Sequence, residues 1–367
     1  MEDLDSYSQE AFGLLKRLIS TQSFSKEEDQ TAGLISDFFT QKGIEIKRIQ
    51  NNVIAYPKDF NTNLPCIWLN SHHDTVKPNA GYTLDPYSPI EKDGKLFGLG
   101  SNDAGGCLVS LMATFLYFYE KEIPANLVLI ASAEEEISGK NGISSIIEEL
   151  PACELAIVGE PTLNMAAVAE KGLMVIDAIT YGKAGHAARN EGVNAIYEAL
   201  EDLETIRGFE FQKESPFLGK SKVTATVIQA GEQHNVVPDQ CKFVLDVRLT
   251  DAYTLEEAFV ELSSKLKSEL TPRSMRLQPS FLPEDHLIQK VLDNLGIEKY
   301  GSPTLSDQAL IPYPSVKIGP GDSARSHMAD EFIYVEEISS GITNYVNILE
   351  MYFNLLKSKS HEALAKG

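Results

Sequence analysis

Apolar residues along the chain are spaced in a way that predicts helices alternating with short strands. Leu14, Leu15 and Leu18 recur with the spacing of one helix face, and a similar stripe follows in residues 28–42. Beyond these segments the apolar residues gather in short runs, which are typical of strands buried on both faces. The predicted helices cover residues 6–20, 28–42, 104–120 and 139–150, and the predicted strands cover Cys66–Asn70, Leu127–Ser132 and Leu155–Gly159. This alternation indicates a mainly parallel, doubly wound sheet with helices on both faces.

The order of predicted elements changes after Gly172. The next segments are expected as strand 172–181, helix 192–207, strands 222–230 and 241–250, helix 254–268 and strand 275–281. This β-α-β-β-α-β order is that of a compact ferredoxin-like unit, with an antiparallel sheet and helices on one side. Three later elements would complete the first domain with the parallel sheet. They are a helix at Asp285–Leu295, a strand at Ser315–Ile318 and a helix at Ser339–Leu356. We therefore expect an α/β fold in which residues 172–283 form a domain inserted into a first domain of residues 1–171 and 284–367.

Composition supports two folded domains and argues against several classes of partner. A chain of 367 residues exceeds the usual size of one domain, and 43% hydrophobic with 23% charged residues is typical of globular proteins. The 32 Lys and Arg against 53 Asp and Glu give a net charge of −21, which repels phosphate backbones and anionic lipids. The longest apolar run, Leu108–Tyr119, is too short to span a bilayer. We expect neither nucleic acid nor a membrane as a partner.

The first residues and the cysteines favour a reducing compartment. Met1-Glu2-Asp3 is acidic where a secretory signal is basic, so we expect a cytoplasmic protein. The four cysteines lie far apart, at Cys66, Cys107, Cys153 and Cys241. This spacing is typical of reduced, buried thiols rather than of a zinc knuckle or a disulfide framework.

Acids and imidazoles directly follow the predicted strands. The first strand is followed by His72-His73-Asp74, the second by Glu134-Glu135-Glu136, the third by Glu160, and the last by a glycine-rich turn that leads to His327. Because the carboxyl ends of parallel strands share one edge of a sheet, we expect these groups to meet in one crevice. Carboxylates that converge there repel one another and raise one another's pKa unless cations neutralise them. Histidines with carboxylates and no thiolate favour a catalytic divalent metal such as zinc, cobalt or manganese.

Each motif taken alone has an ordinary structural alternative. His72 and Asp74 face the same way on an extended strand, so the carboxylate can orient the imidazole, but a surface His beside an Asp gives the same triplet. Asp103 can be a plain helix N-cap. The Gly105-Gly106 pair that follows it indicates close approach of another group to the backbone, which a cap does not require. An acidic triplet is usually a solvated charge run.

Five motifs in order resemble the dinuclear zinc amidohydrolases that include acetylornithine deacetylase, succinyl-diaminopimelate desuccinylase and glutamate carboxypeptidase. They are His72-x-Asp74, Gly98-x-Gly100-x-x-Asp103, Ala133-Glu134-Glu135-Glu136, Gly159-Glu160-Pro161-Thr162, and Gly319-Pro320-Gly321-Asp322 with His327-x-Ala329-Asp330-Glu331. The resemblance covers nearly the whole chain, and five motifs in order are far more specific than any one of them. The overall likeness is greatest to acetylornithine deacetylases.

The resemblance implies roles for particular residues. It implies one metal held by His72, Asp103 and Glu160 and a second held by Asp103, Glu136 and His327, with Asp103 bridging the two. It also implies that Asp74 supports His72 and that Glu135 is the general base. His186, which spacing alone would leave as a loop residue, corresponds to a histidine that reaches into the partner subunit's site. A homodimer is therefore expected.

Further positions bear on substrate recognition. Asn235 and Arg248 correspond to substrate-contacting positions, and Arg248 suits a bidentate contact with a carboxylate. The resemblance also implies that Lys171 lies at the hinge that enters the inserted domain. The chain also departs from the family pattern. Glu134 stands where the family usually has Asp, and Gly105 stands where it commonly has Lys, which removes a cation near the site.

The implied activity is hydrolysis of the Nα-acyl amide of an amino acid with two divalent ions, zinc first and cobalt or manganese as alternatives. Nα-acetylornithine is the first substrate expected, and Nα-acetylcitrulline and the Nα-succinyl forms of either amino acid remain open. The second hypothesis is that the protein is a dipeptidase or an aminotripeptidase. A third hypothesis, of a different class, is that it is a non-catalytic binding or dimerisation module. Such a module would be expected to have lost a metal ligand or the base.

Overall fold

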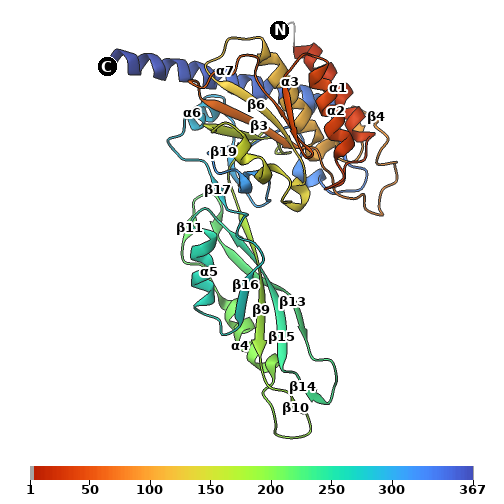
Figure 1. Ribbon diagram of the computed structural model, residues 1–367, viewed down its shortest axis with the longest axis vertical. Helices are drawn as coiled ribbons and strands as arrows, with labels where there is room; N and C mark the ends of the chain where they lie inside the picture. Colours follow the sequence, from red (N-terminus) through yellow and green to blue (C-terminus); the bar gives the residue numbers. More distant parts are fainter. Residues whose placement is uncertain (1–3, 367) are drawn as a thin grey trace. The chain divides into compact units, whose positions relative to one another are not determined.

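The computed structural model describes residues 4–366, and the side chains of residues 4–359. The residues Met1-Glu2-Asp3, on which the expected compartment depends, lie outside the described residues. The chain forms two compact units (Figure 1): the first comprises Met1–Val168, Leu282–Tyr300 and Ser306–Gly367, and the second comprises Ala169–Phe281 and Gly301–Leu305. None of the helices in the described residues combines the length and the apolar character needed to cross a bilayer.

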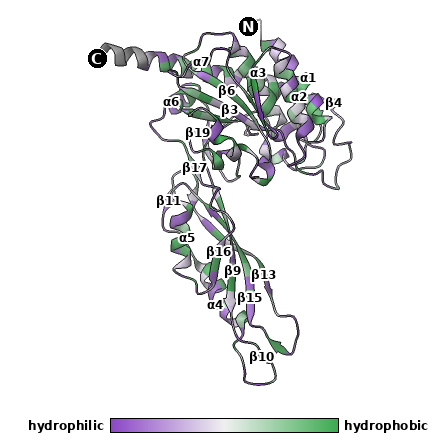
Figure 2. Cartoon of the chain, in the orientation of Figure 1, coloured by the Kyte–Doolittle hydropathy of each residue, from purple (hydrophilic) through white to green (hydrophobic). Residues whose placement is uncertain are grey.

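A nine-stranded sheet, most of whose strands belong to the first unit, has the strand order β1-β2-β6-β3-β7-β19-β8-β17, with β18 paired to β8. The strands are β1 (Ile46–Ile49), β2 (Asn52–Ala55), β3 (Cys66–His72), β6 (Asn126–Ser132), β7 (Leu155–Val158), β8 (Ala166–Glu170), β17 (Ser280–Phe281), β18 (Lys299–Ser302) and β19 (Ser315–Lys317). Strands β6, β3, β7 and β19 run parallel. Strands β1, β2, β8 and β17 pair antiparallel with their neighbours along the strand order. Every residue of β3 and β6 is buried, which explains the unbroken apolar runs Cys66–Leu69 and Leu127–Ala131 within them (Figure 2). The parallel centre confirms the predicted sheet.

The two faces of this sheet carry different layers. Ile67 and Leu69 of β3 pack in a core with five helices, whereas Trp68 between them packs in a separate core on the other face. The five helices are α1 (Leu4–Ile19), α2 (Asp29–Thr40), α3 (Gly106–Tyr119), α6 (Leu287–Asn294) and α7 (Val335–Lys366). The opposite face is covered by the 3-10 turns Ile143–Ser145 and Ile147–Glu149. The expectation of helices on both faces is therefore wrong.

The helix predicted over residues 139–150 is the element that fails. Gly139 and Gly142 lower the helix propensity of this segment, and Pro151 ends it. Only two single turns form, and they place Ile143 and Ile146 against the sheet. The apolar spacing was correct for burial but not for a continuous helix.

A short three-stranded sheet lies beside the main sheet in the first unit. It has the order β20-β5-β4, formed by β4 (Ile90–Lys92), β5 (Lys95–Phe97) and β20 (Phe332–Tyr334). A five-residue turn, Ser101–Gly105, connects this sheet to α3. These elements carry the segments around Asp103 and His327.

The second unit is a four-stranded antiparallel sheet with the order β13-β15-β9-β16. Its elements are β9 (Gly172–Tyr181), β10 (Gly185–His186), α4 (Ala195–Gly208), β11 (Glu214–Ser215), β12 (Gly219–Lys220), β13 (Lys222–Ala230), β14 (Val236–Val237), β15 (Gln240–Leu249), α5 (Leu255–Ser263) and β16 (Glu269–Pro272). Alternate residues of β9 and β15 are buried against α4 and α5, as expected for a sheet with one covered face. The predicted order of elements through α5 matches the structure.

Two boundaries in this unit differ from the predictions. The fourth strand is Glu269–Pro272 instead of 275–281, and it pairs with β9 at Ile176–Ile179. The chain leaves the ladder at Pro272, and Ser280–Phe281 instead pairs with β8. Residues Gly301–Leu305 also belong to this unit, because Gly301 packs against the backbone of Phe217.

Candidate active site

The polar residues at the strand ends of the first unit lie at one edge of its sheet. His72 is the last residue of β3 and stands beside Ser132, the last residue of β6, in the strand register. Glu160 follows β7 by two residues, and His327 follows β19. The predicted meeting of these segments is therefore observed within a single unit.

Two groups of ligand-type atoms meet at this edge. The Nε2 atom of His72 lies 3.3 Å from Oδ1 of Asp103 and 3.7 Å from Oε1 of Glu160. The Nε2 atom of His327 lies 3.0 Å from Oε2 of Glu136 and 3.7 Å from Oδ2 of Asp103. In each group of three residues the ligand atoms all lie within 4.8 Å of one another. Asp103 belongs to both groups and turns one carboxylate oxygen toward each.

The Asp74 carboxylate holds the turn that follows β6. It accepts hydrogen bonds from the backbone N–H groups of Glu135 at 3.0 Å and Glu136 at 3.2 Å, and from the hydroxyl of Ser25 at 2.7 Å. Nδ1 of His72 lies 3.0 Å from the carbonyl oxygen of Asp74 and 3.5 Å from its carboxylate. Asp74 thus fixes both the imidazole and the Glu135-Glu136 turn.

Glu135 and Glu160 are carboxylates in a crowded, buried place. Burial, more than any neighbour, raises the pKa of Glu135 well above its usual value. Burial and then the negative charge of Asp103 raise the pKa of Glu160 to about 8. Burial lowers the pKa of His72, but the surrounding carboxylates, Glu135 first, outweigh it and leave that pKa raised. Such mutual repulsion is what divalent cations relieve, so the donor set fits two metal ions.

Residues 68–351 match the sequence model of peptidase family M20/M25/M40. The chain belongs to this family. It is 26% identical to succinyl-diaminopimelate desuccinylase 2 of a Ruegeria species over 92% of this chain and 93% of that protein. It is 29% identical to acetylornithine deacetylase of Pectobacterium atrosepticum over 72% of this chain and 74% of that protein. Aminopeptidase PepT from Bacillus cereus has a similar fold, with a TM-score of 0.74, 19% identity and coverage of 94% of this chain and 98% of that one.

Family membership establishes the class of the protein. It is a metal-dependent hydrolase that acts on amide bonds, which is the class of activity that the sequence motifs predicted. The names of the two sequence relatives above differ in both the acyl group and the amino acid.

The three consecutive acids Glu134, Glu135 and Glu136 are divided between the site and the protein interior. Glu134 has a left-handed backbone, with φ of 54°, and its side chain accepts hydrogen bonds from the backbone and side chain of Asn141 at 3.2 and 2.8 Å. Glu135 and Glu136 point to the two ligand groups. His73 points away as expected, and it bonds Thr31 and Asn51.

His327 is the most open member of the site. Its side chain is 56% exposed, whereas that of Glu136 beside it is 7% exposed. The hydrogen bond to Glu136 raises the pKa of His327 to about 9. Its backbone is left-handed, with φ of 61°, which turns the ring back toward Glu136 and Asp103.

Sequence reasoning missed two buried carboxylates near the site. Glu331 accepts hydrogen bonds from the turn that carries Asp103, and burial raises the pKa of Glu331 to about 8. Asp307 accepts a 2.6 Å hydrogen bond from Ser132, and burial raises its pKa to about 6. Glu331 stood inside the His327 motif, where its proximity to a ligand was a usable signal. Asp307 lay in a loop that no periodicity distinguished.

The glycine pair after Asp103 is explained by the protein's own packing. A Cβ atom on Gly105 would meet the carbonyl oxygen of Gly100 and, at 2.7 Å, Cδ1 of Leu15. A Cβ atom on Gly106 would meet Cδ1 of Ile333. The predicted close approach to this backbone is confirmed, and the approaching groups belong to the chain itself.

The second unit brings together only some of its candidate residues. His186 on β10 pairs with Val236 on β14, and the N–H of Ala187 donates to the carbonyl of Asn235 at 3.0 Å, so His186 and Asn235 are neighbours. Both are exposed. Arg248 lies near the other end of β15, roughly 26 Å along the strand from Gln240, and its guanidinium binds Asp246 at 2.8 and 3.1 Å.

Lys171 immediately precedes β9, where the chain enters the second unit. Its backbone N–H donates to the carbonyl of Ser302 at 3.2 Å. Both residues belong to the second unit, so this bond fixes the start of β9 within that unit, and the hinge role of Lys171 stays a prediction.

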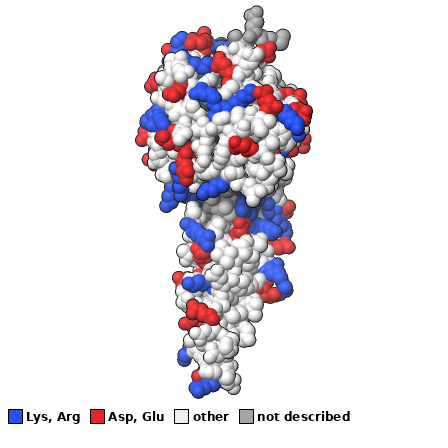
Figure 3. All heavy atoms as spheres, turned by 90° about the vertical axis from the view of Figure 1, so that its right-hand side faces the viewer, with Lys and Arg blue, Asp and Glu red and all other residues white. Residues whose placement is uncertain are grey.

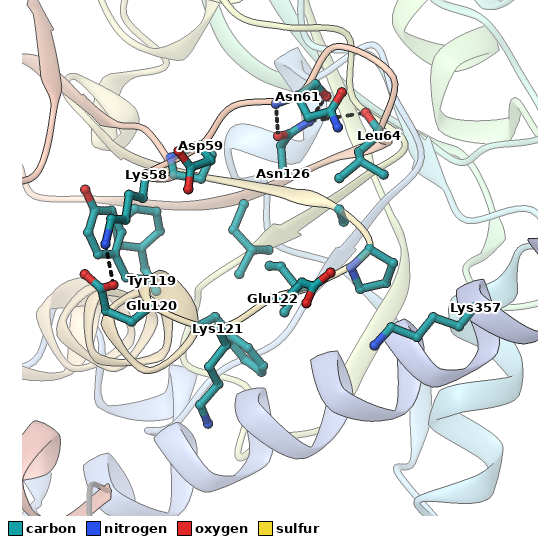
Figure 4. A pocket seen from close by; sticks show the side chains of 17 residues that line it. Lys58, Asp59, Asn61, Leu64, Tyr119, Glu120, Lys121, Glu122, Asn126 and Lys357 are labelled. Carbon is teal, nitrogen blue, oxygen red and sulfur yellow. Dashed lines mark hydrogen bonds and ion pairs between the residues drawn. The ribbon is translucent and has the colours of Figure 1, made fainter.

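The first unit also contains a cavity of about 610 Å³ (Figure 4), and none of the residues in the two ligand groups lines it. Asn126, the first residue of β6, lines it, together with Asn61 and Lys357, and Lys58 and Glu120 form a 2.6 Å ion pair at its side. The ligand groups gather at the opposite, carboxyl ends of the strands. Cavity size therefore does not locate the chemistry in this protein.

Proposed function

We propose that this chain is a deacylase that hydrolyses the amide on the α-nitrogen of an acylated amino acid, with Nα-acetylornithine as the first substrate. The observation that carries the proposal is the pair of ligand groups that share Asp103, with Glu135 beside them. Membership of the M20 family and the names of the sequence relatives support the reaction class. Nα-acetylcitrulline and the Nα-succinyl forms of ornithine and citrulline belong to the same class.

The donor set supports two divalent ions, with zinc first and cobalt or manganese as alternatives. His72, Asp103 and Glu160 would hold one ion, and Asp103, Glu136 and His327 would hold the other. Imidazoles and carboxylates without thiolates are ligands of catalytic zinc. Such ions lower the pKa of a bound water and polarise the carbonyl group of the scissile amide.

Glu135 has the position and chemistry of the proton carrier. Its carboxylate lies 3.8 Å from Nε2 of His72 and does not belong to either ligand group. Burial raises its pKa, which favours a group that first accepts a proton from water and then gives it to the leaving nitrogen. Asp74 keeps this side chain in place through the backbone of the turn.

We further propose that the active form is a homodimer joined through the second unit. Strand β13 is an edge strand, and eight of its nine residues are exposed. Val227 and Ile228 on it are 47% and 54% exposed, and Tyr197 and Leu200 on α4 are 67% and 54% exposed. An unprotected edge with apolar side chains is a template for pairing with a second copy. Figure 3 views the side on which β13 lies in Figure 1 and shows few charges along part of that unit.

The dimer gives the exposed His186 and Asn235 a role. In a pair of chains joined at β13, these residues can serve the site of the second copy, where His186 would stabilise the developing oxyanion. Arg248, once released from Asp246, suits the carboxylate of the substrate. The proposed partners are therefore a small acylated amino acid and a second chain, without nucleic acid or membrane.

A substrate panel tests the proposal. The purified protein, loaded with zinc or cobalt, is assayed with Nα-acetyl and Nα-succinyl derivatives of ornithine and citrulline, and with dipeptides and tripeptides. We expect kcat/KM to be highest for an Nα-acyl amino acid, and Glu135→Gln serves as the inactive control. If kcat/KM is higher for the peptides, the protein is a dipeptidase or an aminotripeptidase, and the proposed deacylase activity is wrong. Fewer than one metal per chain together with no hydrolysis would favour a binding module.

A further inference from the structure

Glu331 is a buried carboxylate that lies outside both ligand groups. It is 2% exposed. One of its oxygens accepts the N–H of Gly100 at 3.0 Å, and the other accepts the N–H groups of Asn102 at 2.8 Å and Asp103 at 3.0 Å. All three amides belong to the turn that presents the shared ligand Asp103. A single side chain therefore holds the backbone of that turn.

The segment that carries Glu331 also carries His327. Strand β20 follows Glu331 and pairs with β5, and the carbonyl of Glu331 accepts the N–H of Gly98 at 2.9 Å. Hydrogen bonds thus connect the segment from His327 to β20 with the segment from β5 to Asp103. The backbone of the turn is irregular, because Gly100 has a φ of 74° and Asp103 has a φ of −117°. A turn of this kind depends on partners outside itself to satisfy its amides.

We propose that Glu331 is a positioning residue that sets the place of the Asp103 carboxylate between the two metal positions. Asp103 serves both ligand groups, one oxygen to each, so a small rotation of its turn would favour one group and open the other. Glu331 resists this rotation because it ties the turn to the segment of His327, which belongs to only one of the groups. This inference rests on the proposed function, since it requires both metal positions to be used.

The neighbouring residue offers a matched control. Asp330 also accepts three hydrogen bonds, from the N–H of Thr83 at 2.8 Å, the hydroxyl of Thr83 at 2.5 Å and the N–H of Leu84 at 2.9 Å. These bonds hold a different loop and do not reach the turn of Asp103. Asp330→Ala and Glu331→Ala therefore remove the same number of bonds from one segment, but only Glu331→Ala releases the shared ligand.

The test is cobalt binding to the metal-free full-length protein. Wild type, Glu331→Ala and Asp330→Ala are titrated with Co²⁺, and binding is followed by the visible absorption spectrum of the bound ion, which depends on its coordination. Groups that orient metal ligands typically change metal affinity by about tenfold to a hundredfold. We expect Glu331→Ala to weaken Co²⁺ binding by at least about tenfold and to change the spectrum, and Asp330→Ala to stay within about twofold of wild type.

A second variant guards against a folding defect. Glu331→Gln keeps the size of the side chain but must turn its NH₂ group toward at least one backbone N–H, so we expect weakening of about threefold or more. The unfolding temperature of each metal-free variant is measured alongside. If Glu331→Ala does not fold, Glu331→Gln decides in its place.

The outcomes separate this inference from the proposed function. If wild type binds two ions while Glu331→Ala and Glu331→Gln bind them with wild-type affinity and spectrum, the positioning role is wrong and the proposed function stands. Equal losses in Asp330→Ala and Glu331→Ala would also overturn it, because the effect would then be general to the segment. If wild type itself binds fewer than two ions, the proposed function fails first.

Discussion

The two units of the chain use charged residues in opposite ways. In the first unit, His72, Asp74 and the acids around them are buried and crowd against one another. In the second unit, the candidate residues His186 and Asn235 are exposed, and Arg248 is bound to its neighbour Asp246. The first unit therefore assembles a site from its own segments, whereas the second presents residues that need something else to act on.

A buried carboxylate in the second unit shows that burial alone does not make a site. Asp202 is 2% exposed, but its oxygens accept the N–H groups of Lys267 and Ser268 and the hydroxyl of Ser268. Its charge is satisfied locally, as for a residue that fixes a loop. In the first unit, burial raises the pKa of Glu135 and of Glu160, and the negative charges of Glu160 and Asp103, respectively, raise these two pKa values further. Cations relieve such repulsion.

The strongest test of this contrast removes the proposed base from the first unit. Glu135→Gln keeps the size of the side chain but cannot accept a proton. We expect kcat to fall by about 10²- to 10⁴-fold, because this is the usual contribution of a general base. Metal content, measured in the same preparation by atomic spectrometry, is expected to stay at the wild-type level because Glu135 belongs to neither ligand group. Near-normal turnover with both ions bound would show that the base lies elsewhere.

The next test asks whether the second unit contributes to the chemistry of another chain. His186→Ala is expected to lower kcat by about a hundredfold, the usual effect of losing one oxyanion donor. Its stability is expected to be unchanged because the side chain is exposed.

Mixing two inactive variants sharpens this test. His186→Ala and Glu135→Gln chains, unfolded and refolded together, are expected to recover about a quarter of wild-type activity, because half of randomly formed symmetric dimers would hold one intact site. If the mixture stays as inactive as its components, His186 does not act across subunits.

A pH test examines the buried histidine of the first unit. Burial lowers the pKa of His73 to about 4, below its ordinary value of 6.5. The unfolded chain therefore binds this proton first, so the stability that neutral His73 provides is complete above pH 6.5 and is lost as the pH falls toward 4. The free energy of unfolding should fall by at most about 3 kcal/mol over this range on account of His73.

Comparison with His73→Gln isolates this contribution in metal-free protein. Glu160 and Glu331, whose pKa values are raised to about 8, act with the opposite sign in both proteins and cancel in the difference. The variant should lose less stability than wild type between pH 7 and pH 4.5, measured by urea unfolding. If the free energy of unfolding changes with pH in the same way in both proteins, His73 makes no pH-dependent contribution to stability.

The smallest expected effect concerns the edge of the second unit. Ile228→Lys places a charge on β13, and we expect the dimer to dissociate about tenfold more readily, because a Lys on an edge strand disfavours pairing. Sedimentation over a range of concentrations measures this change. Val260→Lys is the matched control, since Val260 is 67% exposed on α5 of the same unit. Equal weakening by both variants, or a monomeric wild type, would contradict the proposed interface.

The sequence predicted best where one physical rule dominated. Strands β3, β6 and β7 are buried on both faces, so their apolar runs and the polar residues after them were visible without tertiary information. The antiparallel edge pair β1 and β2 was not found, because strands of four residues leave too short a pattern. The helix predicted over residues 139–150 was wrong because the spacing of the isoleucines indicates only that they are buried, while the glycines prevent a continuous helix.

The site was predictable to the extent that strand ends share an edge. That rule brought His72, Glu160 and Glu136 together from the sequence, with roles supplied by the resemblance. It could not find Asp307, whose importance depends on a hydrogen bond to Ser132 from a distant loop. Nor could it show that Arg248 is far along the strand from His186, since that follows from the strand register.

The close packing around Gly105 limits how the specificity of this enzyme can be re-engineered. The resemblance to the dinuclear zinc amidohydrolases implies a Lys at this position, so Gly105→Lys is the obvious substitution for introducing a cation. The new side chain would have to start between Leu15 and the backbone of Gly100, where even a methyl group has no room. Any route that returns the cation must first rebuild helix α1 and the glycine turn, so a new cationic contact is more accessible from the open loop that bears His327.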